Sequence, residues 1–263
     1  MSRGSAPARR SAGAMLLAAL CLLATTRGAA QGAATVAENT GPNMAIVRRA
    51  SGVYRYESVA DHRRRGEERF TLLVHPDGSR TLNMWHDLAA RNAQFTVVLR
   101  NDARFRPLEA FVSYWNGGQF KGSAHFLVAG SRLTAMSRGP AGLVPQELDV
   151  PAVFSMGSHP VAGDGWHVAG YDAGRGGRQS LQLYSLEAST DLTRPVLGTL
   201  RPLEVERIGD EEVEVPAGRF RATHWRLSGV NDLWVVGEDL LVVKSVIAAR
   251  DLQYLLTELQ RSP

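Results

Sequence analysis

Three tryptophan–histidine neighbours stand out among the side chains that could do chemistry: Trp85-His86, Trp166-His167 and His224-Trp225. Neighbours on a strand point to opposite faces, so a tryptophan packed on one face leaves its histidine on the other. His86 alternates in phase with apolar Leu82 and Met84, and His224 does so with Ala222. We therefore expect both histidines to face an apolar interior, where burial tunes an imidazole for acid–base work.

Other polar and aromatic side chains could complete such a site. The catalytic candidates are His86, His224 and Asp172. The ligand-binding candidates are Trp85, His86, Tyr114, His125, Tyr171 and His224. The alternative for each histidine is a purely structural role, in which neighbours in the core satisfy the ring nitrogens.

The stretch GWHVAGYDAGRGGRQS, residues 165–180, combines glycines with two arginines. Glycine-rich backbone N–H groups together with the Arg175 and Arg178 guanidiniums could hold an anionic headgroup or carboxylate. The stretch lacks the GxxxxGK[ST] pattern of a phosphate-binding loop and does not stand between a strand and a helix. A connection kept soluble by its arginines explains the same residues.

Motifs for other chemistry are missing. The seven histidines show neither H-x-H nor H-E-x-x-H spacing, so we expect no metal and no cofactor. G-x-S-x-G is absent, which argues against an α/β-hydrolase, although a Ser-His-Asp site assembled across strands stays open. The tract HRRRGEERF, residues 62–70, is expected to be a solvated turn in which Glu67 and Glu68 balance the arginines.

The first 30 residues have the pattern of a secretory signal peptide. Arginines precede the apolar run AMLLAALCLLA at 14–24, and small residues at 28 and 30 mark a cleavage site near Ala30. The run is too short to span a bilayer, so we expect no transmembrane segment after its removal. The only cysteine, Cys21, leaves with this leader, so thiol chemistry and disulfides are excluded from the exported chain.

Removal of the leader also changes the charge balance. The whole chain has 30 Lys and Arg against 26 Asp and Glu. The leader carries four of the arginines and no acid, so the exported chain has 26 residues of each sign. A zero formal charge removes the usual argument for binding nucleic acid or an anionic membrane. Oligomeric state is left open.

Period-two alternation of apolar residues dominates after a flexible lead-in at 31–51. Hairpin turns are expected at Pro76-Asp77-Gly78, Asn116-Gly117, Pro216-Ala217-Gly218 and Gly237-Glu238-Asp239. Residues 139–178 carry four prolines and many glycines and are expected to be one irregular loop. The C-terminal DLQYLLTEL fits a helix about as well as a strand, and we favour a strand.

This pattern predicts an all-β fold: an antiparallel meander of ten to twelve strands that forms a barrel or half-barrel, lipocalin-like in general architecture. We expect one such domain over 52–263. A barrel of that strand number is wide enough to leave a cavity for a small apolar ligand.

The segments VEVPAGRF and DLWVVGEDLLVVKSV carry a resemblance. Here the chain resembles a group of uncharacterised bacterial periplasmic β-rich proteins. These have a V-x-V-P-A-G-x-F hairpin near the C-terminus, then a tryptophan-bearing strand and an apolar strand after an acidic turn. The resemblance covers residues 200–250, and 52–130 as a strand pattern. It implies an envelope location and β architecture, and it transfers no active site.

Together these observations predict a periplasmic protein that binds a lipid or other hydrophobic small molecule, with 139–178 as a lid. The first alternative is a cavity enzyme, such as an isomerase, cyclase or hydrolase, with histidine as general acid or base. The second is a structural protein of envelope assembly with a filled interior.

Overall fold

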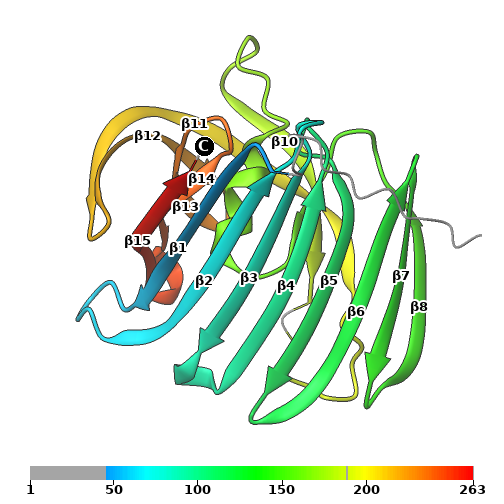
Figure 1. Ribbon diagram of the computed structural model, residues 1–263. Coiled ribbons are helices and arrows are strands. Elements are labelled where there is room, and N and C mark those ends of the chain that lie inside the picture. Colours follow the sequence, from blue (N-terminus) through cyan, green and yellow to red (C-terminus); the bar gives the residue numbers. More distant parts are fainter. Residues whose placement is uncertain (1–45, 188, 263) are drawn as a thin grey trace, which may run out of the picture. The chain divides into compact units, whose positions relative to one another are not determined.

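The computed structural model describes residues 46–187 and 189–262, and these form one fifteen-stranded sheet (Figure 1). The signal peptide and most of the lead-in expected from the sequence lie outside the described residues. The first eight strands are β1 (Arg48–Glu57), β2 (Arg64–Val74), β3 (Arg80–Leu88), β4 (Ala93–Asn101), β5 (Pro107–Asn116), β6 (Gln119–Ala129), β7 (Arg132–Gly139) and β8 (Gly142–Asp149).

The second half of the sheet begins with a short strand, β9, which pairs with β10 in parallel. Its strands are β9 (Ser155–Gly157), β10 (Arg178–Leu186), β11 (Gly198–Val215), β12 (Gly218–Leu227), β13 (Asn231–Val236), β14 (Leu241–Ile247) and β15 (Leu252–Ser262). The described residues also form three 3₁₀ helices: η1 (Ala89–Arg91), η2 (Val161–Val168) and η3 (Ala248–Arg250). No helix within 46–187 and 189–262 is long and apolar enough to cross a membrane.

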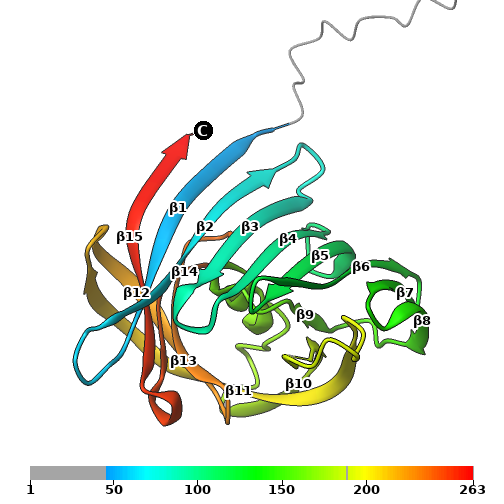
Figure 2. The same cartoon turned by 90° about the horizontal axis from the view of Figure 1, so that it is seen from below.

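The strand order makes the sheet a half-barrel. Strands β8 to β1 run in sequence order, β1 pairs with β15, and β15 to β9 continue the order on the other side. All neighbours are antiparallel except β9 and β10. The edges β8 and β9 are not hydrogen-bonded to each other as strands, so the sheet curls without closing (Figure 2). The predicted antiparallel meander is confirmed in its half-barrel form.

The expected turns follow from local chemistry. Gly117 and Gly118, with φ of 60° and 74°, connect β5 and β6 in a two-residue loop. Positive φ at both positions is the geometry that matches the twist of a hairpin, and glycine adopts it without a steric cost. The Pro216-Ala217 turn joins β11 and β12, and the C-terminal segment is strand β15, as predicted.

Alternation places one face of each strand inside the curve. Phe70, Leu82, Val97, Val112 and Phe126 on β2 to β6 are each at most 3% exposed. Strand β14 departs from alternation, with Leu241, Val242 and Val243 all buried. A register shift against β13 pairs Val235 with Val242 and Trp234 with Lys244, so Val243 is a bulge residue.

The interior of the half-barrel is filled by chain. The helix η2 lies inside the curved sheet, and seven of its eight residues are buried (Figure 2). The segment 139–178 is therefore not one irregular loop, because it also contains β8 and β9. The helix η2 occupies the centre of the half-barrel, and a cavity remains beside it.

Candidate functional site

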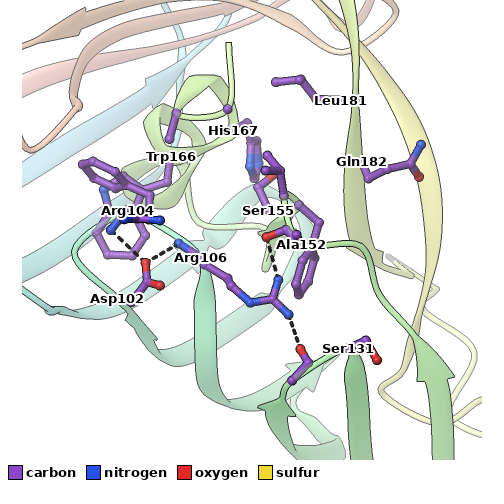
Figure 3. A pocket seen from close by; sticks show the side chains of 16 residues that line it. Asp102, Arg104, Arg106, Ser131, Ala152, Ser155, Trp166, His167, Leu181 and Gln182 are labelled. Atoms are coloured by element: carbon purple, nitrogen blue, oxygen red, sulfur yellow. Dashed lines mark hydrogen bonds between the residues drawn. The ribbon is translucent and has the colours of Figure 1, made fainter. Parts of the chain in front are cut away.

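A cavity of about 500 Å³ lies beside η2 (Figure 3), close to the turns that join β4 to β5 and β6 to β7. Four parts of the chain enclose it: the turn between β4 and β5, the turn between β6 and β7, the segment 152–155, and the end of η2 with β10. Its lining residues are Asp102, Arg104, Phe105, Arg106, Gly130, Ser131, Ala152, Val153, Phe154, Ser155, Trp166, His167, Ala169, Gly170, Leu181 and Gln182.

Aromatic and aliphatic side chains form much of the wall. The Phe105 and Trp166 rings meet edge to face with centroids 5.9 Å apart. Trp166 is 3% exposed, and its indole N–H donates to the carbonyl of Asp239 at 3.1 Å. Because both ends of this indole are fixed by packing and by a hydrogen bond, this part of the wall is held rigid.

Arg106 holds the rim together. Its Nη1 donates to the carbonyls of Pro151 and Ala152 at 2.8 Å each, and its Nη2 donates to the carbonyl of Gly130. The guanidinium carbon lies 5.2 Å from the centre of the Phe154 ring. Among the described residues no carboxylate lies within 4.0 Å of this cation, so its charge is balanced by carbonyl dipoles beside the cavity.

Two buried polar atoms on the wall have no hydrogen-bond partner. They are Oγ of Ser155 and Nδ1 of His167, whose residues are 6% and 5% exposed. Nε2 of His167 lies 3.4 Å from Oδ1 of Asp164, and Asn231 donates to the other oxygen of Asp164 at 3.1 Å. Buried polar groups are normally paired, so unpaired polar atoms on two residues that line a cavity mark a place where a ligand could bind.

A second polar cluster lies deeper, under the start of η2. Glu68 is fully buried, and its two carboxylate oxygens accept the N–H groups of Val161 at 2.7 Å and Ala162 at 2.9 Å. The Tyr56 hydroxyl donates to the same carboxylate. Burial outweighs these hydrogen bonds and raises the pKa of Glu68 to about 8. The expectation that Glu68 belongs to a solvated turn is wrong.

Two histidines lie against this cluster. His86 contacts Tyr56 edge to face at 4.6 Å, and both His86 and His159 pack against the Phe95 ring. Burial lowers the pKa of His86 to about 3 and that of His159 to about 4, so both are neutral. Neither Nε2 has a hydrogen-bond partner. Within 46–187 and 189–262 no three metal-binding side chains are grouped around a common point.

The sequence-based candidates are distributed over several places, and none lines the cavity of about 500 Å³. His86 faces inward as expected, and Trp85 faces outward with 37% exposure. Tyr114 also faces inward, where its ring stacks on Phe95 with centroids 4.1 Å apart. His86 and Tyr114 therefore meet through Phe95 in the core.

His125 and His224 lie on the outer face. Nε2 of His125 lies 2.8 Å from Oε1 of Glu109. His125 is exposed, whereas its neighbours Ala124 and Phe126 on β6 are buried on the other face. The ring of His224 stacks on Trp234 with centroids 4.3 Å apart, while Nε2 lies 3.3 Å from Asp232. The expected inward facing of His224 is wrong, because burial along β12 loses its two-residue period between Ala222 and Trp225. Beside His224 the pairing with β11 shifts register, and Ile208 of β11 is the extra residue.

The residues of the glycine-rich stretch make local contacts. The Tyr171 hydroxyl donates to the carbonyl of Gly177 at 2.8 Å, and its ring meets Trp225 at 4.9 Å. Oδ1 of Asp172 accepts backbone N–H groups of the following turn, including that of Arg175 at 3.3 Å. Arg178 pairs with Glu206 at 3.2 Å.

Sequence reasoning missed the residues that build the cavity. Arg106 and Ser155 carry no spacing signal, because they come from a turn and a three-residue strand. His167 was one of the three tryptophan neighbours, and that pairing is the one signal that could have singled it out.

The fold and this cavity define an open β half-barrel with an internal helix. No family model matches the chain, and no curated protein sequence does. A DUF1089 family protein from Pseudomonas aeruginosa is similar in structure, with a TM-score of 0.40 and 14% identity over 67% of this chain and 87% of that one. An exported-protein candidate with a YmcC-like fold from Bacteroides fragilis gives a TM-score of 0.28 and 11% identity, covering 80% and 95%. Both TM-scores are below 0.5, so neither likeness carries an inference about function.

Proposed function

We propose that this chain is an exported, periplasmic protein that binds a lipid or other hydrophobic small molecule in the cavity beside η2. The observation that carries the proposal is a space of about 500 Å³ whose wall combines Phe105, Phe154 and Leu181 with a few polar groups. Pockets for small organic ligands have volumes of roughly 300–1,000 Å³ and this mixture of lining groups. The leader pattern of residues 1–30 supports export.

The polar groups suggest how such a ligand would be oriented. The Arg106 guanidinium is fixed at the rim by three carbonyls, and Arg104 lies close by in the same turn. An acidic or strongly polar end group would meet these cations, while an apolar body would pack against Leu181 and Phe154. A long-chain carboxylic acid combines both features.

Substitution of Leu181 by Trp tests the site directly. The added ring occupies the cavity, so we expect the affinity for a fluorescent polyene fatty acid to fall at least ~10-fold, or ~1.4 kcal/mol. The matched control is Leu127→Trp, which adds the same ring at an outer-face position with 46% exposure. Titration followed by fluorescence measures both variants.

Unchanged binding by Leu181→Trp would overturn the assignment of the cavity. Absence of any uptake by the folded parent chain would instead favour the structural role in envelope assembly. A fatty alcohol competing as well as the fatty acid would show that the arginines do not select the end group.

A further inference from the structure

Ser155 and His167 line the same cavity from two different elements. Ser155 begins β9, and a Cβ built on Gly157 of the same strand would lie 3.7 Å from Nε2 of His167. Side chains two residues apart on a strand point to the same face. Ser155 therefore projects from the face of β9 that meets the His167 ring, and both line the cavity (Figure 3).

Each of the two groups is available to form a hydrogen bond with the other. Oγ of Ser155 and Nδ1 of His167 are buried and have no hydrogen-bond partner, so they are not hydrogen-bonded to each other in this state. Hydrogen bonds between a nucleophile and its base are often long until substrate binds. The short connection between β9 and η2 keeps both groups in one rigid corner of the cavity.

Asp164 stands behind the imidazole. Its Oδ1 lies 3.4 Å from Nε2 of His167, three residues further along η2. Asn231 donates to Oδ2 of Asp164 at 3.1 Å and to Ser245 at 2.9 Å, which fixes the carboxylate. A carboxylate at Nε2 selects the tautomer whose proton is on Nε2, so Nδ1 carries the lone pair that a general base needs.

From this arrangement we propose that Ser155, His167 and Asp164 form an esterase site that cleaves esters with an apolar acyl group held in the cavity. This rests on the proposed function, because the same cavity supplies the acyl-binding space. Ser155 is the nucleophile, His167 is the general acid–base, and Asp164 is a positioning residue.

The reaction proceeds in two balanced steps. Oγ of Ser155 attacks the ester carbonyl carbon while its proton passes to Nδ1 of His167. The C–O bond to the alcohol breaks, and the alcohol leaves with that proton, so an acyl-serine remains. Water then attacks the acyl carbon, His167 takes and returns a proton, and the products are a carboxylic acid and free Ser155.

Active-site labelling tests the nucleophile on the full chain. A fluorophosphonate probe is expected to add once per chain, and peptide mass spectrometry is expected to place the adduct on Ser155. Ser155→Ala is expected to abolish labelling. The matched control is Ser158→Ala, which removes a second buried serine hydroxyl of the same segment that lies outside the cavity lining. An adduct elsewhere, or labelling that survives Ser155→Ala, overturns the proposal.

Turnover and a thiol variant test the base. Hydrolysis of p-nitrophenyl octanoate is expected to fall ~10²–10⁴-fold in His167→Asn. A cysteine at position 155 reacts with iodoacetamide as the thiolate, and an imidazole positioned by Asp164 favours that form. With increasing pH, alkylation of Ser155→Cys is therefore expected to begin at a lower pH than alkylation of Ser155→Cys/Asp164→Asn. Identical pH profiles would overturn the role of Asp164.

The binding assay separates this proposal from the proposed function. Fatty-acid uptake that persists in a chain without labelling or turnover would retain the binding protein and overturn the esterase. Failure of uptake as well as labelling would overturn both.

Discussion

At the scale of single residues, Glu68 is a buried ionisable group whose titration changes the stability of the fold. It is fully buried under η2 and accepts two backbone N–H groups of that helix. Its pKa of about 8 means that it keeps a proton at pH 7 that the unfolded chain, with an ordinary pKa of 4.5, has released. Stability therefore falls as the pH rises from about 4.5 to about 8.

His86 and His159 act in the opposite direction. Their pKa values of about 3 and about 4 keep them neutral in the fold, whereas the unfolded chain protonates them below their ordinary value of 6.5. Stability therefore falls as the pH drops from 6.5 toward these values. Between pH 4.5 and 6.5 two histidines outweigh one glutamate, so these three groups place the maximum stability near pH 6.5.

Glu68→Gln is expected to remove the decline in stability above pH 6.5, because a neutral amide replaces the group that titrates. Urea unfolding at pH 6.5, 7.5 and 8.5 measures the slope. Glu67→Gln serves as the control, since Glu67 lies one residue earlier on the outer face and pairs with Arg64 and Arg69. Equal slopes for the parent chain and Glu68→Gln would contradict this account.

Period-two alternation predicted the facing of His86 and the inner positions of Phe70 and Leu82. Continuing the same phase back along β2 places Glu68 inside. The charge-rich tract around it favoured a solvated turn, because ionised groups are rarely buried. Its two helix N–H partners come from 93 and 94 residues away, which local sequence does not reveal.

At the scale of elements, η2 depends on glycines that allow close packing. A Cβ on Gly165 would lie 1.9 Å from the carbonyl oxygen of Leu240. A Cβ on Gly170 would lie 2.6 Å from Cγ1 of Val153, at the cavity wall. Both glycines lie in the segment that was expected to be an irregular loop, and a sequence pattern does not distinguish a packing glycine from a flexible one. The prolines and glycines of 139–178 therefore favoured an irregular loop over the ordered helix η2 that the segment contains.

Gly165→Ala is expected to destabilise the fold by about 1–3 kcal/mol, since the methyl group forces η2 away from β14. Displacement of Trp166 would also reshape the cavity, so fatty-acid affinity is expected to fall in the same variant. Gly209→Ala is the control, because a Cβ there meets nothing within 4 Å. Thermal melting of the two variants decides the point: equal melting temperatures would show that η2 is not tightly packed against β14.

At the scale of the whole sheet, side chains join the edge strand β8 to β10 and β11 across the opening of the half-barrel. The Gln146 side chain of β8 donates to the carbonyl of Gly198 at 2.9 Å, and the Tyr184 hydroxyl of β10 donates back to it at 2.5 Å. Pro145 stands next to Gln146 on this edge, where a missing N–H discourages pairing with another chain. Alternation and turn residues predict the meander. They do not predict how its edges are held together, because these hydrogen bonds join residues distant in sequence.

The central claim is that the cavity beside η2 holds a hydrophobic small molecule. The most direct measurement is to purify the chain from a bacterial periplasmic fraction, extract it with organic solvent and analyse the extract by mass spectrometry. We expect a lipid, fatty acid or similar molecule at close to one per chain, and its loss from Leu181→Trp but not from Leu127→Trp. An extract with no such molecule above trace amounts, from protein that unfolds cooperatively, would contradict the account.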